Sequence, residues 1–205
     1  MIEQQQTLNG IGRILKSQVT ILGSFVILIW LLEIIDQVFF HNSLNAWGVR
    51  PRTISGLTGI FLMPFLHNGL GHVLANTVPF VVLGWLVMLR RTADFFFVSI
   101  VVVLVSGLGI WLLGGPNTVH IGASGLIFGY FGFLVLRSYF ERSFISIVMA
   151  VIVVLIYGGL IWGVLPSIQS GVSWLGHLFG FVGGAWAAYL LTTRMRNSEF
   201  TGRIL

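Results

Sequence analysis

G-A-S-G-L-I-F-G-Y-F-G at 122–132 and G-H-L-F-G-F-V-G-G at 176–184 are the two stretches that decide the fold of this chain. Each lies in a long apolar segment, and its glycines recur every three or four residues, which places them on one helical face. Such faces let two helix backbones approach closely, so we expect the two segments to pack together. Ser124 borders the first face and His177 the second, and polar side chains in apolar helices tend to mark function.

The composition indicates a membrane protein. Hydrophobic residues make up 56% of the 205 residues and charged residues only 8%, and the mean hydropathy is +0.96. Neither a soluble domain nor a disordered chain has this balance. Apolar segments long enough to cross a bilayer as helices occupy 19–38, 70–89, 95–113, 124–140, 144–165 and 174–192. We therefore predict an all-α membrane protein with a bundle of six transmembrane helices.

The basic residues predict the topology. Of the 11 lysines and arginines, only Arg50 and Arg52 fall on one side of the predicted membrane. Cytoplasmic flanks retain basic residues, so we expect a multi-pass protein of the cell membrane with both termini in the cytoplasm. The domain is 19–192, between a short cytoplasmic segment (1–18) and a short cytoplasmic tail (193–205). The net charge of +5 reflects this topology, and no basic stripe interleaved with aromatic residues suggests a nucleic-acid partner.

Two connections have a predicted structure of their own. The stretch from 41 to 69, with W-G-V-R-P-R at 47–52, is too long for a turn and too apolar for a flexible linker. We expect a structured loop between helices 1 and 2 in the outer interface, partly as a short amphipathic helix. G-G-P-N-T-V-H-I-G at 114–122 cannot face lipid, because its backbone groups would lack partners. If it dips into the protein, Ser124 opens its helix below the membrane surface.

The hydroxyl of Ser124 and the imidazole of His177 form a candidate catalytic pair. A hydrogen bond between them is the minimum that lets histidine take the serine proton during attack on a carbonyl. Taken singly, a serine between glycines is commonly a packing residue and a membrane histidine is commonly structural. The matched glycine faces favour the catalytic interpretation, because they bring the two side chains to one interface.

His72 and Asn76 stand at i and i+4 in H-V-L-A-N (72–76), on one face of the second predicted helix. They lie near the outer end of that helix, on the same side as Ser124 and His177. Together with the backbone N–H of Ser124 they are candidate donors to the oxyanion of an acyl-transfer reaction. The alternative is that both side chains only link helices by hydrogen bonds.

The other polar residues have smaller predicted roles. The second, fourth, fifth and sixth helices contain no acidic residue, so we expect a dyad, with Phe128 holding the imidazole by ring packing. We interpret Glu33 and Asp36 as structural acids that pair with Arg50 or Arg52. The absence of cysteine excludes disulfides and thiolate chemistry. The loop histidines do not resemble a metal site and H-E-x-x-H is absent, so we expect no metal and no cofactor.

Three motifs in this order resemble the rhomboid intramembrane serine proteases: the two quoted above and F-L-H-N-G-L-G-H-V-L-A-N at 65–76. The similarity runs from about Trp47 to about Leu191. It implies a six-helix rhomboid core with Ser124 as nucleophile, His177 as general base, and an oxyanion hole formed by His72 and Asn76.

The resemblance also implies several accessory features. The backbone from Gly122 to Ser124 would complete the oxyanion hole, and the fifth helix with the following loop would gate access. P-S-I-Q-S-G-V-S at 166–173 would suit a movable cap. The chain departs from relatives at Phe128, where some have tyrosine. It also departs at Arg50, which follows Gly48 and Val49 instead of following tryptophan directly.

The predicted function is cleavage of transmembrane or juxtamembrane segments of other membrane proteins by a serine endopeptidase within the lipid bilayer. The second hypothesis is a catalytically inactive rhomboid-like adaptor or quality-control protein, although such proteins usually lack the serine or the histidine. A small-solute transporter ranks third, because the chain has no internal repeat of the inverted-repeat kind.

Overall fold

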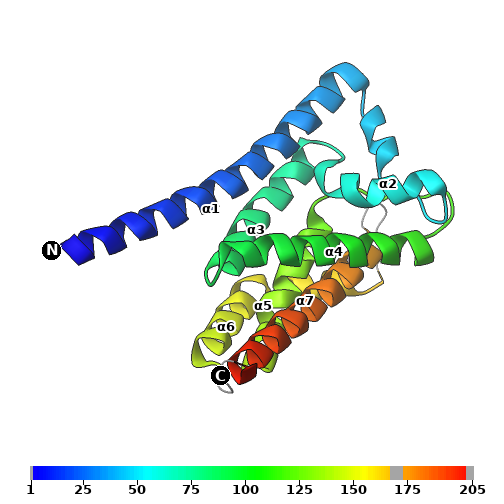
Figure 1. Cartoon of the computed structure of the whole chain (residues 1–205). Helices are drawn as coiled ribbons and strands as arrows, with labels where there is room; N and C mark the ends of the chain where they lie inside the picture. The colour runs from blue at the N-terminus through cyan, green and yellow to red at the C-terminus, as the bar shows by residue number, and fades with distance from the viewer. Residues whose placement is uncertain (1, 167–172, 202–205) are drawn as a thin grey trace.

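The computed structural model describes residues 2–166 and 173–201, which are helical apart from connecting loops and one isolated β-bridge between Val49 and His120. The α-helices, in chain order (Figure 1), are α1 (Ile2–Ile35), α2 (Ile54–Leu62), α3 (Leu70–Met88), α4 (Thr92–Leu113), α5 (Ser124–Glu141), α6 (Phe144–Tyr157) and α7 (Trp174–Thr201). Shorter helical turns lie at Asp36–Phe40, Ser43–Trp47, Met63–Phe65 and Gly158–Val164; the last, a 3-10 segment, is called η4 below.

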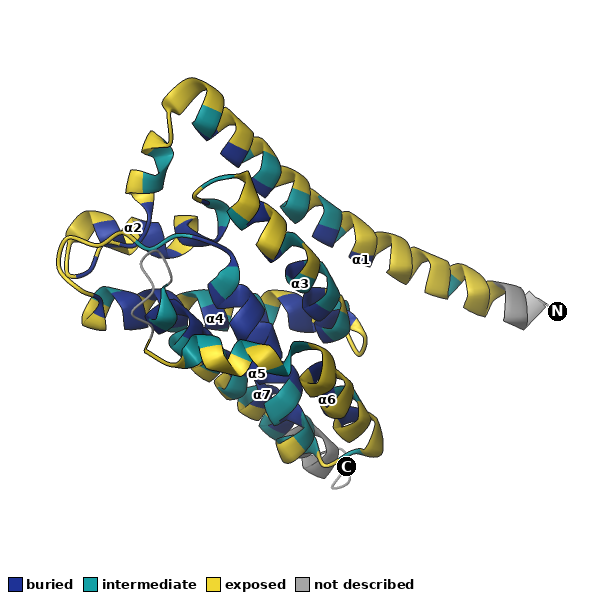
Figure 2. Cartoon of the chain, turned by 180° about the vertical axis from the view of Figure 1, so that it is seen from behind, coloured by how far each residue is buried: buried dark blue, intermediate teal, exposed yellow. Residues whose placement is uncertain are grey.

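The centre of the bundle is α5. Its residues are buried without interruption from Gly125 to Leu134, and it packs against α3, α4, α6 and α7. Figure 2 shows the burial concentrated in these inner helices, whereas α1 is mostly exposed and leans on the bundle through α3. A helix buried on all sides needs apolar or small residues around its circumference, which the glycine-rich and aromatic sequence of α5 supplies.

The six-helix prediction agrees with this architecture. Among the described residues, five helical stretches are long and apolar enough to cross a membrane: Gln6–Phe40, Leu70–Met88, Thr92–Leu113, Phe144–Val164 and Trp174–Met195. The remaining predicted helix is α5, which is enclosed by the others and carries Arg137 and Glu141 in its last turns. The short helix expected in the loop after helix 1 is α2.

Two helix boundaries differ from the prediction. The first helix begins at Ile2, so residues 2–18 of the predicted cytoplasmic segment form the first part of α1 without a break. Its glutamines and leucines are good helix formers, and no proline interrupts them. The predicted helix 144–165 ends as an α-helix at Tyr157 and continues as η4. Gly158 and Gly159 stand at this change, where glycine weakens the α-helix.

The loop between α1 and α3 is folded against the loop that precedes α5. The backbones of Val49 and His120 exchange two hydrogen bonds of 3.0 Å. The N–H of Arg52 donates to the carbonyl of Trp111 (2.9 Å), and the indole of Trp111 donates to the carbonyl of Thr53 (2.8 Å). The loop is therefore a structured element, as predicted, and it supports the segment that leads to Ser124.

The predicted pairing of Glu33 and Asp36 with loop arginines is wrong. A carboxylate oxygen of Glu33 accepts from the N–H of Gly69 (2.7 Å), and one of Asp36 accepts from the N–H of Leu44 (3.0 Å). Unpaired backbone N–H groups at the start of a helix attract carboxylates, because nothing within the helix satisfies them. Glu33 thereby ties α1 to the beginning of α3.

Candidate active site

Ser124 is the first residue of α5, and a tight turn places it there. Gly122 has φ of +110°, and a Cβ at this residue would lie 2.8 Å from Cε1 of His72. The N–H of Gly122 donates to the carbonyl of Met63 (2.9 Å), which fixes the turn to the preceding loop. Both the left-handed backbone and the close approach of His72 therefore require glycine at 122.

The glycine faces of α5 and α7 meet as predicted. A Cβ on Gly180 would collide with the carbonyl oxygen of Gly125, and one on Gly184 would collide with the carbonyl oxygen of Gly129. The backbones of the two helices are therefore in direct contact over these turns. This contact sets His177, in the first turn of α7, beside the first turn of α5.

The imidazole of His177 is held from two sides. The ring of Phe128 stacks on it, with 4.0 Å between ring centroids and 5° between planes. Its Nδ1 lies 3.0 Å from the carbonyl oxygen of Gly163. Because a carbonyl only accepts hydrogen bonds, Nδ1 carries the proton of this bond. Nε2 of the neutral ring then keeps its lone pair, which is the state that a general base requires.

Gly163, in η4, is a site residue that the sequence did not reveal. A Cβ at this position would lie 2.5 Å from Cζ of Phe128 and 3.3 Å from Nδ1 of His177. A larger residue would therefore separate η4 from the histidine. The available signal was the spacing of glycines at 158, 159 and 163 in a predicted helix, but a contribution from a backbone carbonyl leaves no side-chain signature.

Ser124, His177, His72, Asn76 and Phe128 all line one cavity of about 940 Å³. Its lining, drawn from the described residues, contains no carboxylate. The hydrogen bonds of the described residues do not include one between Ser124 and His177, so their direct contact stays a prediction. Catalytic hydrogen bonds of enzymes without substrate are often long and shorten only when substrate binds.

His72 and Asn76, on the inner face of α3, reach the same cavity. Nδ1 of His72 accepts from the N–H of Asn68 (3.3 Å), so the neutral ring carries its proton on Nε2. That Nε2 would lie 2.9 Å from a Cβ on Gly122, immediately before the nucleophile turn. Nδ2 of Asn76 is buried and has no hydrogen-bond partner in the described part of the chain. Both are donors available to a bound oxyanion.

His67 is a second residue that the sequence analysis did not place in the site. It is fully buried, and its Nε2 accepts from the N–H of Ala123 (3.3 Å). Its ring lies 5.0 Å from that of His72. Burial, and then the proximity of His72, lowers the pKa of His67 to about 4. The ring is therefore neutral at pH 7, and it can accept the backbone N–H beside Ser124.

His120 links the loop before α5 to the start of α7. Its Nδ1 lies 2.7 Å from the hydroxyl of Ser173, and its Nε2 lies 2.9 Å from the hydroxyl of Thr118. The Ser173 hydroxyl also accepts from the N–H of Gly176 (3.3 Å), which caps α7. Burial lowers the pKa of His120. The neutral ring thus joins the two segments that carry Ser124 and His177.

Two further expectations from the sequence concern a movable cap and metal binding. The movable cap was placed at 166–173, and residues 167–172 lie outside the described residues. The other expectation concerned metal ions, of which we predicted none. Residues 2–166 and 173–201 contain no group of three or more His, Asp or Glu side chains that could hold a metal ion.

The chain is similar to known proteins over most of its length. A family model for the Rhomboid domain matches residues 55–194. An uncharacterized protein of Mycobacterium tuberculosis is 41% identical over 88% of this chain and 78% of its own length. Another of Mycobacterium leprae is 42% identical over 88% and 74%. The putative rhomboid protease YdcA of Bacillus subtilis is 30% identical over 61% of this chain and 62% of its own length.

Proposed function

Because the chain belongs to the rhomboid family, we propose that it is a serine endopeptidase that hydrolyses peptide bonds in transmembrane or juxtamembrane segments of other membrane proteins. The observation that carries this proposal is the state of His177. Its Nδ1–H is engaged by Gly163 and its ring is stacked on Phe128, while the ring lines the same cavity as Ser124. This arrangement offers a serine hydroxyl an oriented base.

The proposed reaction proceeds by acyl transfer. The Oγ of Ser124 attacks the scissile carbonyl carbon, and Nε2 of His177 takes the hydroxyl proton. The negative charge that forms on the carbonyl oxygen is stabilised by Nε2–H of His72, the amide of Asn76 and the N–H of Ser124. When the C–N bond breaks, His177 gives the proton to the leaving amine. A water molecule then attacks the ester, and the carboxylic acid and the free serine are released.

The dyad has to stabilise an imidazolium ion without a carboxylate. The carbonyl oxygen of Gly163 accepts from Nδ1–H, so the negative end of its dipole faces the imidazolium. The stacked ring of Phe128 adds a face-on contact to the cation. In this proposal Gly163 performs the orienting part of the role that an aspartate has in a triad. Unlike an aspartate, the carbonyl supplies no net charge, so the histidine of this dyad is a weaker base than the histidine of a triad.

Water and substrate both need access to the cavity. Asn45, Arg50 and Asn68 line it at the end of the bundle that carries Ser124, and Arg50 and Asn68 are exposed there. A substrate helix has to unwind locally, because a helical carbonyl is already hydrogen-bonded and shielded. From the distribution of basic residues we place this end outside the cytoplasm of the cell, with both termini inside.

The direct test is cleavage of a transmembrane reporter by purified protein in proteoliposomes. Ser124→Ala and His177→Ala should lower kcat by about 10⁴-fold or more, because the members of a catalytic unit act together. Ser138→Ala is the matched control, since among the described residues this hydroxyl bonds only to the carbonyl of Val135 in its own helix, at the other end of α5. Cleavage by the Ser124→Ala protein at the parent rate would refute the proposal.

An inactive membrane adaptor is the second candidate. It is favoured by the fact that the hydroxyl of Ser124 makes no hydrogen bond to His177 among the described residues. A fluorophosphonate probe separates the two functions, because only an activated serine is phosphonylated rapidly. Labelling that requires both Ser124 and His177 supports the protease, and absence of labelling in protein that retains its helical fold supports the adaptor.

A further inference from the structure

A second cavity, of about 500 Å³, lies at the end of the bundle opposite Ser124. It is bounded by the end of α3, the end of α5 and the start of α6. Both α3 and α6 pack against α5, so they form the two walls and α5 forms the floor. Cavities of about 300–1,000 Å³ are typical of small-molecule sites.

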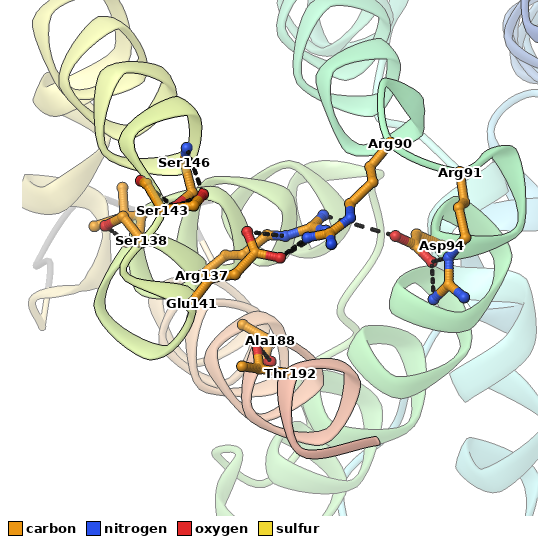
Figure 3. A network of polar contacts seen from close by, with 11 residues as sticks. Arg90, Arg91, Asp94, Arg137, Ser138, Glu141, Ser143, Ser146, Ala188 and Thr192 are labelled. Atoms are coloured by element: carbon orange, nitrogen blue, oxygen red, sulfur yellow. Dashed lines mark hydrogen bonds and ion pairs between the residues drawn. The ribbon is translucent and has the colours of Figure 1, made fainter. Parts of the chain in front are cut away.

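One part of the lining is polar and carries positive charge. It consists of Arg90, Arg137, Glu141, Ser143 and Ser146. Figure 3 shows these side chains converging from the turn after α3, the end of α5 and the start of α6. The carboxylate of Glu141 is shared, because it pairs with both Arg90 and Arg137.

The charges of the wider network do not cancel. Arg91 and Arg137 both pair with Asp94, at 2.8 Å and 3.6 Å. With Arg90 and Glu141 the network holds three arginines against two carboxylates, which leaves one positive charge. The Arg90 side chain is 50% exposed, and a guanidinium has five N–H donors. It therefore keeps donors for an anion while it pairs with Glu141.

The start of α6 adds further donors. Ser143 caps this helix by accepting from the N–H of Ser146 (3.2 Å). The N–H groups of the first turn before Ser146 have no partner within the helix, and an α-helix N-terminus favours negative charge. Ile145, in this turn, lines the cavity, so the first-turn amides and Arg90 border the same space.

The other part of the lining is apolar. It is formed by Leu86, Leu89, Leu134, Ile145 and Met149. A free inorganic anion would make no favourable contact with such an apolar wall. A molecule that joins a phosphate to hydrocarbon chains matches both parts, and in a membrane protein the end of the helices is the depth at which these two parts of a lipid meet.

We propose that this cavity binds one anionic phospholipid, with its phosphate beside Arg90 and the start of α6 and its acyl chains along the apolar wall between α3 and α6. The carboxylate of Glu141 keeps Arg137 in place and limits the positive charge that faces the lipid. This site is independent of the proposed protease activity, because it lies at the other end of α5.

Native mass spectrometry of the full chain in a neutral detergent tests the proposal. The probes are dihexanoyl-phosphatidylglycerol, dihexanoyl-phosphatidylcholine and inorganic phosphate. We expect one phosphatidylglycerol per chain, bound at least about fivefold more tightly than either other probe, as expected for about 1 kcal/mol per charge contact. Equal binding of the choline lipid, or of phosphate alone, would overturn the proposal.

Two pairs of variants locate the site. Arg90→Gln should weaken phosphatidylglycerol binding about fivefold, whereas Arg142→Gln, at the same end but outside the lining, should change it less than twofold. Met149→Trp should fill the apolar part and weaken binding without touching the ion pairs, and Leu155→Trp, 79% exposed on the same helix, is its control. Equal losses in a variant and its control would indicate diffuse attraction and refute a defined site.

Discussion

The two ends of α5 differ in how their buried polar groups are partnered. At the Ser124 end, polar groups are held with donors unused: Nδ2 of Asn76 is buried without a partner in the described structure. At the other end, buried charges form ion pairs: Asp94 with Arg91 and Arg137, and Glu141 with Arg90 and Arg137. Oδ2 of Asp94 lies 3.6 Å from Arg137 and makes no hydrogen bond within the described structure. An unused buried donor costs stability, and a buried ion pair, whose net contribution is small, becomes strongly destabilising when one partner is removed.

We infer that the two ends of α5 have different roles. The paired end anchors α3, α4 and α5 to one another, so that the unpaired end can keep groups ready for a substrate. If this is correct, substitutions at the two ends separate stability from activity.

Removal of Asp94 should reduce stability most. The side chain is 2% exposed and faces two arginines, so Asp94→Leu leaves Arg90, Arg91 and Arg137 with the carboxylate of Glu141 alone. We expect a loss of about 4 kcal/mol in the free energy of unfolding, measured by denaturant titration in detergent micelles. Reporter cleavage per folded molecule should be unchanged. A loss of cleavage without a loss of stability would contradict the division between the two ends.

Replacement of Asn76 should have the reverse effect. Asn76→Leu removes a donor that we assign to the oxyanion, a buried Nδ2 that has no hydrogen-bond partner among the described residues. Cleavage should fall by about 10²–10³-fold, or about 3–4 kcal/mol in the activation free energy, while the midpoint of unfolding stays the same or rises. The measurements are kcat in proteoliposomes and thermal unfolding. An unfolded variant would show instead that Asn76 is a structural link between helices.

His67 should make stability depend on pH. Its pKa is lowered to about 4 by burial, against about 6.5 for an exposed histidine. The unfolded chain therefore binds the extra proton first as the pH falls. The contribution is complete above pH 6.5 and is lost between pH 6.5 and pH 4, so stability at pH 5 should be about 2 kcal/mol lower than at pH 8.

The control for this pH effect is His67→Gln, whose side-chain oxygen is able to accept the N–H of Ala123 and does not titrate in this range. Unfolding midpoints of parent and variant, measured from pH 4 to pH 8, should agree most closely at pH 8 and diverge as the pH falls, because only the parent loses stability through this group. The same slope in both proteins would show that another group is responsible.

Gly163→Ala should have the smallest effect of the four. The added methyl group would press on Phe128 and shift η4 away from His177, which weakens the bond that fixes the ring. We expect about a tenfold loss in kcat, or about 1.4 kcal/mol, with little change in KM. Gly159→Ala is the matched control, because a Cβ there meets nothing within 4 Å. Equal kcat values for both variants would remove Gly163 from the positioning of the base.

Much of the fold follows from patterns that are local in the sequence. Apolar length gave the helix positions, and the recurrence of Gly180 and Gly184 opposite Gly125 and Gly129 predicted the contact of α5 with α7. The partners of Glu33 were predicted wrongly. The reason is that a backbone N–H at a helix start, here that of Gly69, competes with arginine for a carboxylate and has no signature in the sequence.

In the candidate site, too, contacts that involve backbone groups could not be predicted from the sequence. His72, Asn76, Ser124, Phe128 and His177 were identified from spacing and from the rhomboid resemblance, and they line one cavity. The carbonyl of Gly163 and the acceptor nitrogen of His67 were not identified, because each contact joins a backbone group to a side chain of a distant segment.

The sequence by itself determined that this chain is a helical membrane protein with a serine and a histidine on two glycine faces, because hydropathy and helical period are properties of consecutive residues. Only the tertiary structure decided which nitrogen of His177 is free, which donors near Ser124 are unused, and that α3 and α6 enclose a charged cavity at the far end. These depend on distances between residues that are remote in the chain, and hydrogen bonds and burial are set by such distances alone.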